Sequence, residues 1–341
     1  MIKNWLITGA AGFLGHHMVE HILRNTEDNI ICIDKLSYAS KGLEKLRSFN
    51  ALSNPRVKMF TIDLVNKISE GIDYEIGDVN YIVHLAAETH VDNSIADPVN
   101  FVMNNVSSTL NMLEFAKTRL ARGLEKFIYF STDEIYGNAP GNIAYKEDDR
   151  QHPTNPYSAS KSASEMICLS YENTYKIPLI ITNTMNLYGE RQHPEKWIPK
   201  IMKYIVTGKE LEIHSDKNCL NPGTRSYIHA RNCADAILFI IKNGVIGQRY
   251  NIAGEKEVNN LDIMLTIYEY MNNYQKKNGL EKYNIQYKLV DFHSDRPGHD
   301  LAYRLDPTKL ANLGWTPPVN FERSLEKVVN WTMSRKELLL D

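Results

Sequence analysis

Residues 8–15 read Thr-Gly-Ala-Ala-Gly-Phe-Leu-Gly, and this stretch decides the fold. An apolar run of strand length precedes it, and a helical pattern follows it. Gly9 allows a tight turn, Gly12 lets backbone N–H groups approach a pyrophosphate, and Gly15 lets the helix pack closely on the strand. A glycine triplet alone is weak evidence, but its place between a strand and a helix makes it informative. The stretch therefore predicts a dinucleotide-binding turn.

The second apolar run ends in an acidic residue. Asp34 follows Ile31-Cys32-Ile33 and falls 19 residues past Gly15. A carboxylate at this place accepts hydrogen bonds from the ribose hydroxyls of adenosine and repels a 2′-phosphate. The sequence therefore favours NAD over NADP. The competing interpretation is a glycine turn followed by an unrelated aspartate.

Strands and helices alternate through the first half of the chain. Apolar runs of strand length lie at 4–8, 29–33, 57–62, 80–86, 126–131 and 178–184. Helical patterns lie between several of them, at 13–24, 98–120 and 157–176. This alternation implies right-handed crossovers and a parallel sheet with helices on both faces. The predicted fold class is α/β, a Rossmann-type doubly wound parallel sheet with a smaller C-terminal α/β substrate lobe.

The pattern changes after residue 185, where long polar connections, prolines and shorter elements follow. We predict an NAD-binding Rossmann domain at 1–185, to which part of about 225–252 returns. The substrate lobe is expected to comprise about 186–224 and 253–341.

Composition excludes several classes of function. The chain has 341 residues, with 39 basic against 41 acidic side chains, so charge gives no reason to expect nucleic acid or a membrane surface as a partner. No apolar run reaches the roughly 18 residues that span a bilayer. The four cysteines are scattered, which predicts reduced thiols and a cytoplasmic location. His17 and His21 are four apart, but no third ligand lies near them, so we expect no metal.

Tyr157 and Lys161 lie one helical turn apart, just after Pro156. Residues at this spacing share one face of a helix. A phenol titrates near pH 10 and is a poor base at neutral pH. A neighbouring ammonium group, together with a positive nicotinamide, stabilises the phenolate and is expected to lower the pKa of Tyr157. The alternative is an ordinary surface pair.

Asp133 and Glu134 stand side by side after Thr132, where the apolar run 126–131 ends. The end of a strand in a parallel sheet is where such folds present their chemistry. Adjacent carboxylates repel each other, so that one tends to keep a proton at neutral pH. An exposed turn with two solvated acids is the alternative interpretation.

These motifs together resemble the extended short-chain dehydrogenase/reductase family that acts on nucleotide sugars, and most closely the nucleoside-diphosphate-glucose 4,6-dehydratases. The resemblance runs nearly the whole length. It is carried by TGAAGFLG (8–15), DKLSYAS (34–40), LAAETHVDNSI (85–95), STDEIYG (131–137), NPYSASK (155–161), NLYGERQHPEKWIP (186–199), TRSYIH (224–229) and DRPGHD (295–300). Related 4-epimerases share the glycine and Tyr/Lys motifs but do not normally carry the Thr-Asp-Glu triplet.

The resemblance implies bound NAD, a nucleoside-diphosphate-glucose substrate and five catalytic residues. Tyr157, beside Lys161, takes the proton from the glucose 4-hydroxyl while C4 passes a hydride to NAD⁺, helped by Thr132. Glu134 then removes the C5 proton, and Asp133 protonates the departing 6-hydroxyl. The hydride returns to C6 and Glu134 reprotonates C5, which leaves a 4-keto-6-deoxy sugar. An epimerase needs only the redox step, whereas elimination needs both an acid and a base.

The resemblance also implies the binding residues. Those expected to hold NAD are Gly9, Gly12, Phe13, Leu14, Gly15, Asp34, Lys35, Ser37, Asp63, Leu64, Leu85, Ala86, Ala87, Asn105, Tyr157 and Lys161. Those expected to hold the substrate are Thr89, Thr132, Asn186, Lys196, Trp197, Arg225, Asn260, Arg296 and His299. The two arginines suit clamps on a diphosphate.

Three departures from the bacterial dTDP-glucose enzymes concern the nucleotide. Asn93 stands where those enzymes usually have Arg, Leu187 stands where they have a second Asn, and the segment between Asp216 and Arg225 is slightly expanded. HVDNS and TRSY look more like the UDP-glucose 4,6-dehydratase domain of plant rhamnose synthases. We therefore expect UDP-glucose to be used at least as well as dTDP-glucose, in rhamnose-type deoxysugar biosynthesis.

The pattern at 98–120 matches the helix that builds the family's homodimer, although its apolar stripe could equally pack on the sheet. Four other functions stay open at this point. They are a dTDP-glucose-specific dehydratase, a nucleotide-sugar 4-epimerase, a catalytically inactive NAD-binding module and an alcohol dehydrogenase that uses free NAD in each cycle.

Overall fold

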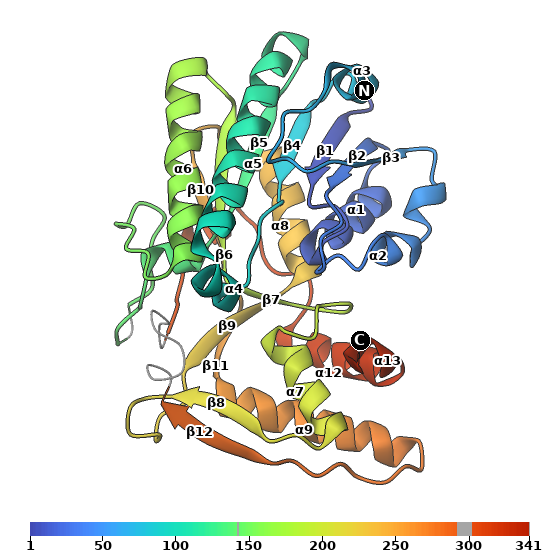
Figure 1. Cartoon of the computed structure of the whole chain (residues 1–341), viewed down its shortest axis with the longest axis vertical. Coiled ribbons are helices and arrows are strands. Elements are labelled where there is room, and N and C mark those ends of the chain that lie inside the picture. Colours follow the sequence, from blue (N-terminus) through green and yellow to red (C-terminus); the bar gives the residue numbers. More distant parts are fainter. Residues whose placement is uncertain (142, 292–301, 341) are drawn as a thin grey trace.

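A seven-stranded parallel sheet forms the centre of the larger lobe in the computed structural model, which describes residues 1–141, 143–291 and 302–340. Its strands are β1 (Asn4–Thr8), β2 (Asn29–Asp34), β3 (Val57–Thr61), β4 (Tyr81–His84), β5 (Lys126–Thr132), β6 (Leu179–Thr184) and β10 (Arg249–Ile252). They lie in the order β10-β6-β5-β4-β1-β2-β3, and every neighbouring pair is parallel. Helices cover both faces (Figure 1), so the predicted doubly wound fold is confirmed.

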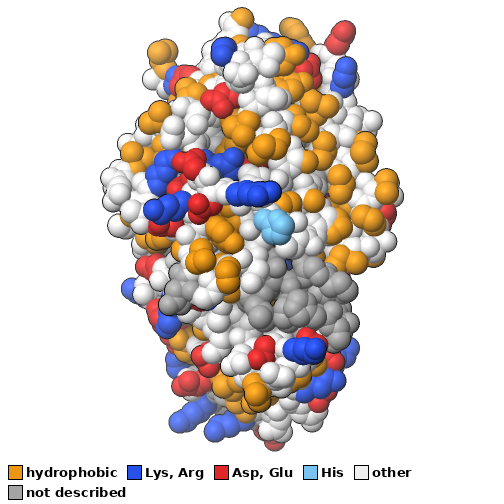
Figure 2. Space-filling model, turned by 90° about the vertical axis from the view of Figure 1, so that its left-hand side faces the viewer, with side chains coloured by type: hydrophobic (Ala, Val, Ile, Leu, Met, Phe, Trp, Pro, Cys, Tyr) orange, Lys and Arg blue, Asp and Glu red, His pale blue; other side chains and the backbone are white. Residues whose placement is uncertain are grey.

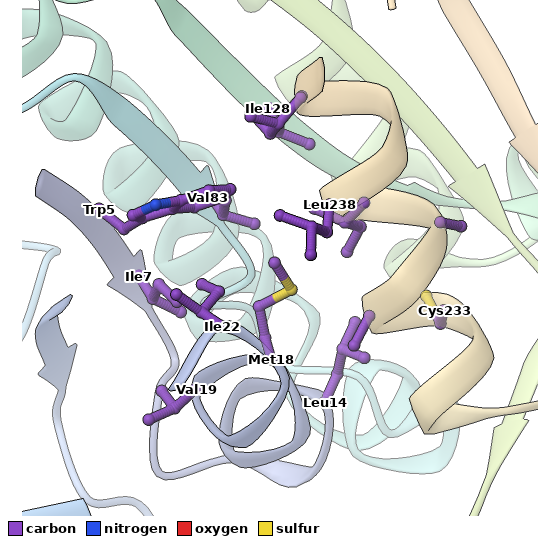
Figure 3. Packing of buried hydrophobic residues seen from close by; sticks show 14 of the residues in the cluster. Trp5, Ile7, Leu14, Met18, Val19, Ile22, Val83, Ile128, Cys233 and Leu238 are labelled. Carbon is purple, nitrogen blue, oxygen red and sulfur yellow. The ribbon is translucent and has the colours of Figure 1, made fainter. Parts of the chain in front are cut away.

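One face of this sheet is covered by α1 (Phe13–Asn25) and α8 (Ala230–Asn243). Leu14, Met18 and Ile22 are spaced four residues apart, so they form one stripe along α1. Figure 3 shows this stripe meeting Val83 of β4 and Leu238 of α8 in a shared apolar cluster. The predicted helix at 13–24 therefore exists because its apolar positions recur at helical spacing.

The opposite face is covered by α3 (Glu70–Ile76), α5 (Pro98–Arg119) and α6 (Pro156–Tyr175). Both long helices begin at a capped turn with proline in the first helical position, where a missing N–H costs nothing. The Asp97 side chain caps α5, and Asn155 caps α6. Short elements complete this lobe: α2 (Glu44–Arg47), η1 (Ala51–Ser53), α4 (Val91–Ala96), η2 (Leu120–Arg122), η3 (Asp133–Tyr136) and α11 (Thr308–Asn312).

The smaller lobe lies below the large sheet in Figure 1. A three-stranded sheet contains β7 (Asn186–Tyr188), β9 (Thr224–His229) and β11 (Lys256–Asn259), and a parallel pair contains β8 (Leu211–Ser215) and β12 (Tyr287–Asp291). Among the described residues, four helices share its apolar core: α7 (Trp197–Thr207), α9 (Asn260–Lys277), α12 (Phe321–Met333) and α13 (Glu337–Leu340).

The chain crosses between the lobes more than once. It leaves the large sheet after β6, builds β7 to β9 in the smaller lobe, and returns through α8 and β10. It then enters the smaller lobe again at β11. Single bridges also join Tyr145 to Leu305 and Thr224 to Ala302.

The strand predicted at 80–86 is shortened most at its end, since β4 ends at His84. The N–H groups of Leu85 and Ala86 donate to the hydroxyl of Thr8, each at 3.1 Å, instead of continuing the sheet. This turns the chain outward toward a cavity at the strand ends. Across the described residues, we find no helix with the length and apolarity needed to span a bilayer.

Candidate active site

A cavity of about 340 Å³ opens where the strands of the large sheet end. In doubly wound sheets ligands bind outside the carboxyl ends of the strands, where the strand order reverses. Its walls come from the segments after β1 to β6, from α6, and from the start of α7 in the smaller lobe. The lining includes Gly9, Gly12, Phe13, Leu14, Gly15, Asp34, Lys35, Ser37, Asp63, Leu64, Leu85, Ala86, Ala87, Thr89, Thr132, Asp133, Glu134, Tyr157, Lys161, Asn186, Lys196 and Trp197, all predicted as site residues.

The glycine turn after β1 leaves no room for side chains. Gly9 has a φ of +67°, which L-residues rarely adopt. A Cβ atom on Gly15 would stand 2.0 Å from the carbonyl oxygen of Gly9, and one on Gly12 would stand 3.0 Å from the same atom. The glycines therefore make a tight turn, and such a turn lets backbone N–H groups come close to a bound phosphate.

Asp34 is fixed at the end of β2 by two backbone donors. Its carboxylate accepts hydrogen bonds from Ala11 N (3.0 Å) and Leu36 N (2.7 Å). Burial raises the pKa of Asp34, and these two N–H groups oppose the rise. The carboxyl group thus ties the glycine turn to the loop after β2.

Lys45 braces that same loop from α2, and sequence reasoning missed it. Its Nζ atom donates to the carbonyl oxygens of Ala39 (3.0 Å) and Ser40 (2.6 Å), both of which belong to cavity-lining residues. Burial lowers the pKa of Lys45 to about 8, while the charge of Asp34 opposes that fall. A lysine in a polar segment is expected to be exposed, so nothing in the sequence indicated that Lys45 is buried beside the cavity.

Thr132, Asp133 and Glu134 follow one another where β5 passes into η3. The Thr132 hydroxyl donates to Asp133 Oδ1 (3.1 Å) and accepts from the backbone N–H of Glu134 (3.3 Å). The other oxygen of Asp133, Oδ2, is buried without a hydrogen-bond partner among the described residues. Burial, and then the charge of Glu134, raise the pKa of Asp133 to about 7. Asp133 is therefore the carboxyl group that holds a proton near neutral pH.

Tyr157 and Lys161 reach the cavity from one face of α6. Lys161 Nζ donates to the carbonyl oxygen of Phe130 (2.6 Å), and burial lowers its pKa to about 8. Burial and the charge of Glu134 raise the pKa of Tyr157, while the hydroxyl of Thr132 opposes the rise. In the protein alone, burial has the largest effect on this pKa. That Lys161 and a positive nicotinamide together lower the pKa of Tyr157 stays a prediction.

Asn105 lies behind the cavity rather than on its wall. Its side-chain oxygen accepts from Glu88 N (2.8 Å), and its amide nitrogen donates to Glu88 O (3.1 Å) and to Ser160 Oγ (2.9 Å). These contacts join the loop after β4 to the start of α6. The side-chain amide of Asn105, which was predicted to bind cofactor, therefore forms its hydrogen bonds with protein groups.

The predicted substrate residues divide into three groups. Thr89, Asn186, Lys196 and Trp197 line the cavity, and Lys196 Nζ donates to Thr89 O at 3.1 Å. Trp197 Nε1 is buried with no hydrogen-bond partner in the part of the chain that is described. Arg225 and Asn260 lie off the lining. Arg296 and His299 fall outside the described residues.

Arg225 is nevertheless close enough to influence the acids. It is buried, with its guanidinium 4.8 Å from the centre of the Tyr303 ring, and its charge acts to lower the pKa of Asp133. Gln192, His193 and Glu195 line the cavity although none was predicted. All three belong to the motif NLYGERQHPEKWIP. The motif therefore indicated that this segment is part of the site, but not that these three side chains line it.

Comparison with protein-family models places this chain. Residues 6–328 match the family model described as GDP-mannose 4,6 dehydratase. This chain belongs to that family. A dTDP-glucose 4,6-dehydratase of Haemophilus influenzae is 36% identical over 341 residues, covering 97% of this chain and 98% of that protein. The resemblance and enzyme class read from the motifs are confirmed.

A plant relative from Arabidopsis thaliana is named as a trifunctional UDP-glucose 4,6-dehydratase/UDP-4-keto-6-deoxy-D-glucose 3,5-epimerase/UDP-4-keto-L-rhamnose-reductase. It is 35% identical over 342 residues, covering 98% of this chain but 48% of that protein. Among solved structures, the dTDP-glucose 4,6-dehydratase DesIV of Streptomyces venezuelae with NAD bound gives a TM-score of 0.84 at 30% identity, covering 98% of each chain. The UDP-glucuronic acid 4-epimerase of Bacillus cereus in complex with NAD gives 0.83 at 26%, covering 98% of this chain and 99% of that one.

Proposed function

We propose that this protein converts a nucleoside-diphosphate-glucose into the 4-keto-6-deoxy sugar nucleotide. The reaction oxidises C4, eliminates water across C5 and C6, and reduces C6. The cofactor is NAD. One observation carries the proposal: a buried carboxyl group that keeps its proton near neutral pH, Asp133, adjoins a second carboxyl group, Glu134, in the cavity that holds Tyr157. Elimination needs an acid and a base together, and a simple oxidation does not.

The chain's residues fit NAD. The glycine turn brings bare backbone to the start of α1, where N–H groups favour a pyrophosphate. Asp34 stands at the end of β2, where a carboxylate accepts from the ribose hydroxyls. When bound, NAD takes the hydride from C4 and later returns it to C6, so no free cofactor is consumed.

Tyr157 and Thr132 act in the oxidation. Tyr157 accepts the proton of the sugar 4-hydroxyl. The Thr132 side chain orients the sugar 4-hydroxyl and also favours the ionised form of Tyr157. Lys161 contributes a buried positive charge near the same strand end. Burial otherwise opposes ionisation of Tyr157, so proton transfer depends on these donors and on the positive nicotinamide of the bound cofactor.

Asp133 and Glu134 act in the elimination. Glu134, which is partly buried at the cavity wall, removes the proton from C5 once the ketone at C4 has acidified it. Asp133, protonated near neutral pH, gives its proton to the departing 6-hydroxyl. As the hydride returns to C6, Glu134 gives a proton back to C5, which completes the 4-keto-6-deoxy sugar. Because the two carboxyl groups differ in environment, one chain segment supplies both an acid and a base.

The fold does not distinguish this reaction from 4-epimerisation, and a nucleotide-sugar 4-epimerase is the second candidate. Mass spectrometry of the products from UDP-glucose and dTDP-glucose separates the two. A product lighter by one water supports the dehydratase, whereas a product of unchanged mass contradicts it. Substrate deuterated at C4 should give product deuterated at C6, because the hydride stays in one site. Loss of that label to added free NAD would identify an alcohol dehydrogenase instead.

We also propose that UDP-glucose is used at least as well as dTDP-glucose, in rhamnose-type deoxysugar biosynthesis. The similarity to the plant relative supports this, and the similar identity to bacterial relatives keeps dTDP-glucose as the alternative. The substrates differ by a methyl group and a ribose 2′-hydroxyl. A methyl in an apolar pocket discriminates by only about 10–200-fold. Leu187 lines the cavity and adds an apolar surface.

A homodimer through α5 and α6 is the third part of the proposal. The outer face of these helices exposes Val99 (70%), Met103 (56%), Leu110 (39%) and Met166 (48%). Figure 2 shows apolar side chains spread over the upper part of this side of the molecule. Analytical ultracentrifugation of the parent and of Met103→Glu tests it, since a charge on this face should shift the protein toward monomer.

The predicted cytoplasmic location stays a prediction. All four cysteines are free thiols.

A further inference from the structure

Asn155 links the oxidation and the elimination of the proposed reaction. It was not predicted as a site residue. It is buried, with 6% of its surface exposed, and it caps the helix that carries Tyr157. Its side-chain oxygen accepts from the backbone N–H of Ser158 (2.9 Å). Its Nδ2 atom lies 3.4 Å from Oε2 of Glu134 and donates to it. One amide therefore contacts both the helix start and the carboxylate.

The cap fixes which way this amide points. Ser158 Oγ accepts from the backbone N–H of Asn155 (3.2 Å), so the two residues form a reciprocal capping box. A flipped amide would set its NH₂ group against the N–H of Ser158, which is a donor facing a donor. The helix start thus requires the oxygen on its own side, and this leaves the NH₂ group on the side of Glu134.

We propose that Asn155 is a positioning residue that holds the Glu134 carboxylate, ionised and aimed, for removal of the C5 proton. The inference rests on the proposed dehydratase function. A hydrogen bond donated to a carboxylate favours its charged form and limits its rotation. Pro156 separates Asn155 from Tyr157, so the same short turn sets the base of the elimination and the tyrosine of the oxidation relative to each other.

The competing explanation is that Asn155 serves only as a helix cap, and two substitutions separate these roles. Asp and Ser are N-caps about as good as Asn, because each offers an oxygen to the first backbone N–H groups. Asn155→Asp keeps the shape and the cap, but it turns an oxygen toward Glu134 in place of the donor. Asn155→Ser keeps the cap and removes the donor without adding charge.

Single-turnover mixing of the NAD-loaded enzyme with substrate measures the two steps separately. The rise of enzyme-bound NADH reports oxidation, and its decay together with solvent deuterium entering at C5 reports elimination and the return of the hydride. We expect Asn155→Asp to slow elimination about 10–100-fold, and Asn155→Ser less, with NADH accumulating in both. The oxidation rate and the melting temperature should stay near those of the parent.

A double-mutant cycle decides the inference. In a Glu134→Gln background, Asn155→Asp should slow elimination no further, because the carboxylate that the amide holds is gone. Elimination at the parent rate in Asn155→Asp, or equal slowing with and without Glu134, would overturn the role of Asn155. Elimination at the parent rate in Glu134→Gln alone would instead overturn the base assignment, and with it the proposed function at this residue. The two failures are therefore distinguishable.

Discussion

The ammonium group of Lys45 lies 2.6 Å from the carbonyl oxygen of Ser40, inside the loop that follows β2. Lys45→Met keeps the aliphatic stem but leaves the carbonyl oxygens of Ser40 and Ala39 without this donor. An unpaired buried polar group costs about 1–3 kcal/mol, so the loop should loosen. Once bound cofactor has been removed, we expect NAD to bind about tenfold more weakly to this variant than to the parent, measured by calorimetric titration.

Arg47→Met on the same short helix is the matched control. Arg47 is exposed and pairs with Glu44, away from the cavity lining. Unchanged NAD affinity is expected for this variant, and UDP should bind equally to both variants. Equal NAD affinity in Lys45→Met and the parent would show that the brace is not needed.

Tyr157→Phe should abolish the first oxidation, because no phenol remains to accept the proton of the 4-hydroxyl. Losing a positioned acid or base typically costs on the order of 10²–10⁴ in rate. Stopped-flow absorbance should detect no burst of bound NADH after substrate is added. Tyr175→Phe, on the same helix with 42% of its surface exposed, should keep the parent burst. A full burst in Tyr157→Phe would refute its assignment.

Replacing Asp133 by Asn and Glu134 by Gln together should stop the reaction after oxidation. Neither amide can exchange a proton as the carboxyl groups do, whereas Tyr157 remains intact. Enzyme-bound NADH should therefore accumulate with substrate present, and water release should slow by about 10²–10⁴. Should the double variant release water near the parent rate, the two acids have other roles.

Asp133 should also change how stability depends on pH. Its pKa is raised from 3.8 to about 7 in the folded protein. Its contribution to stability is complete below pH 3.8 and is lost as pH rises through about 7, because the unfolded chain ionises first. Asp133→Asn, which stays neutral, should melt higher than the parent at pH 8, and the difference should shrink toward pH 5. Exposed Asp148, changed to Asn, should give no such trend.

The ratio of kcat/KM for UDP-glucose and dTDP-glucose tests the nucleotide proposal. We expect UDP-glucose to equal or exceed dTDP-glucose when both are measured in one buffer. A tenfold ratio corresponds to about 1.4 kcal/mol of transition-state stabilisation. A preference for dTDP-glucose beyond tenfold would end this part of the proposal and would leave the dehydratase reaction intact.

Sequence patterns predicted six of the seven strands of the large sheet, mostly because the central strands are buried on both faces and form continuous apolar runs. The edge strand β10 was not predicted as a strand. The glycine turn and the triplet at 132–134 were also readable, since few other structures need those residues at that spacing. Side-chain direction was not readable. Asn105 and Arg225 were both expected to contact a ligand, yet neither lines the cavity.

The residues that sequence reasoning missed share one physical cause. Lys45 and Asn155 are polar, and polar residues usually face water or cap helices without further roles. Lys45 acts through backbone groups of the adjoining loop, and Asn155 acts through a side chain that the fold brings from another segment. The burial of Tyr157, which raises its pKa in the protein alone, likewise depends on the packing of distant elements.

Because α8 and β10 return to the large sheet late in the sequence, one face of that sheet stays incompletely covered during synthesis on the ribosome. Six strands of that sheet are complete once residue 184 has been made, but the helix that covers Ile128 and Ile180 is not. At synthesis rates of about 5–20 residues per second, this apolar face waits several seconds for its cover. We therefore expect the N-terminal part made alone to expose this part of the apolar face and to be prone to aggregation.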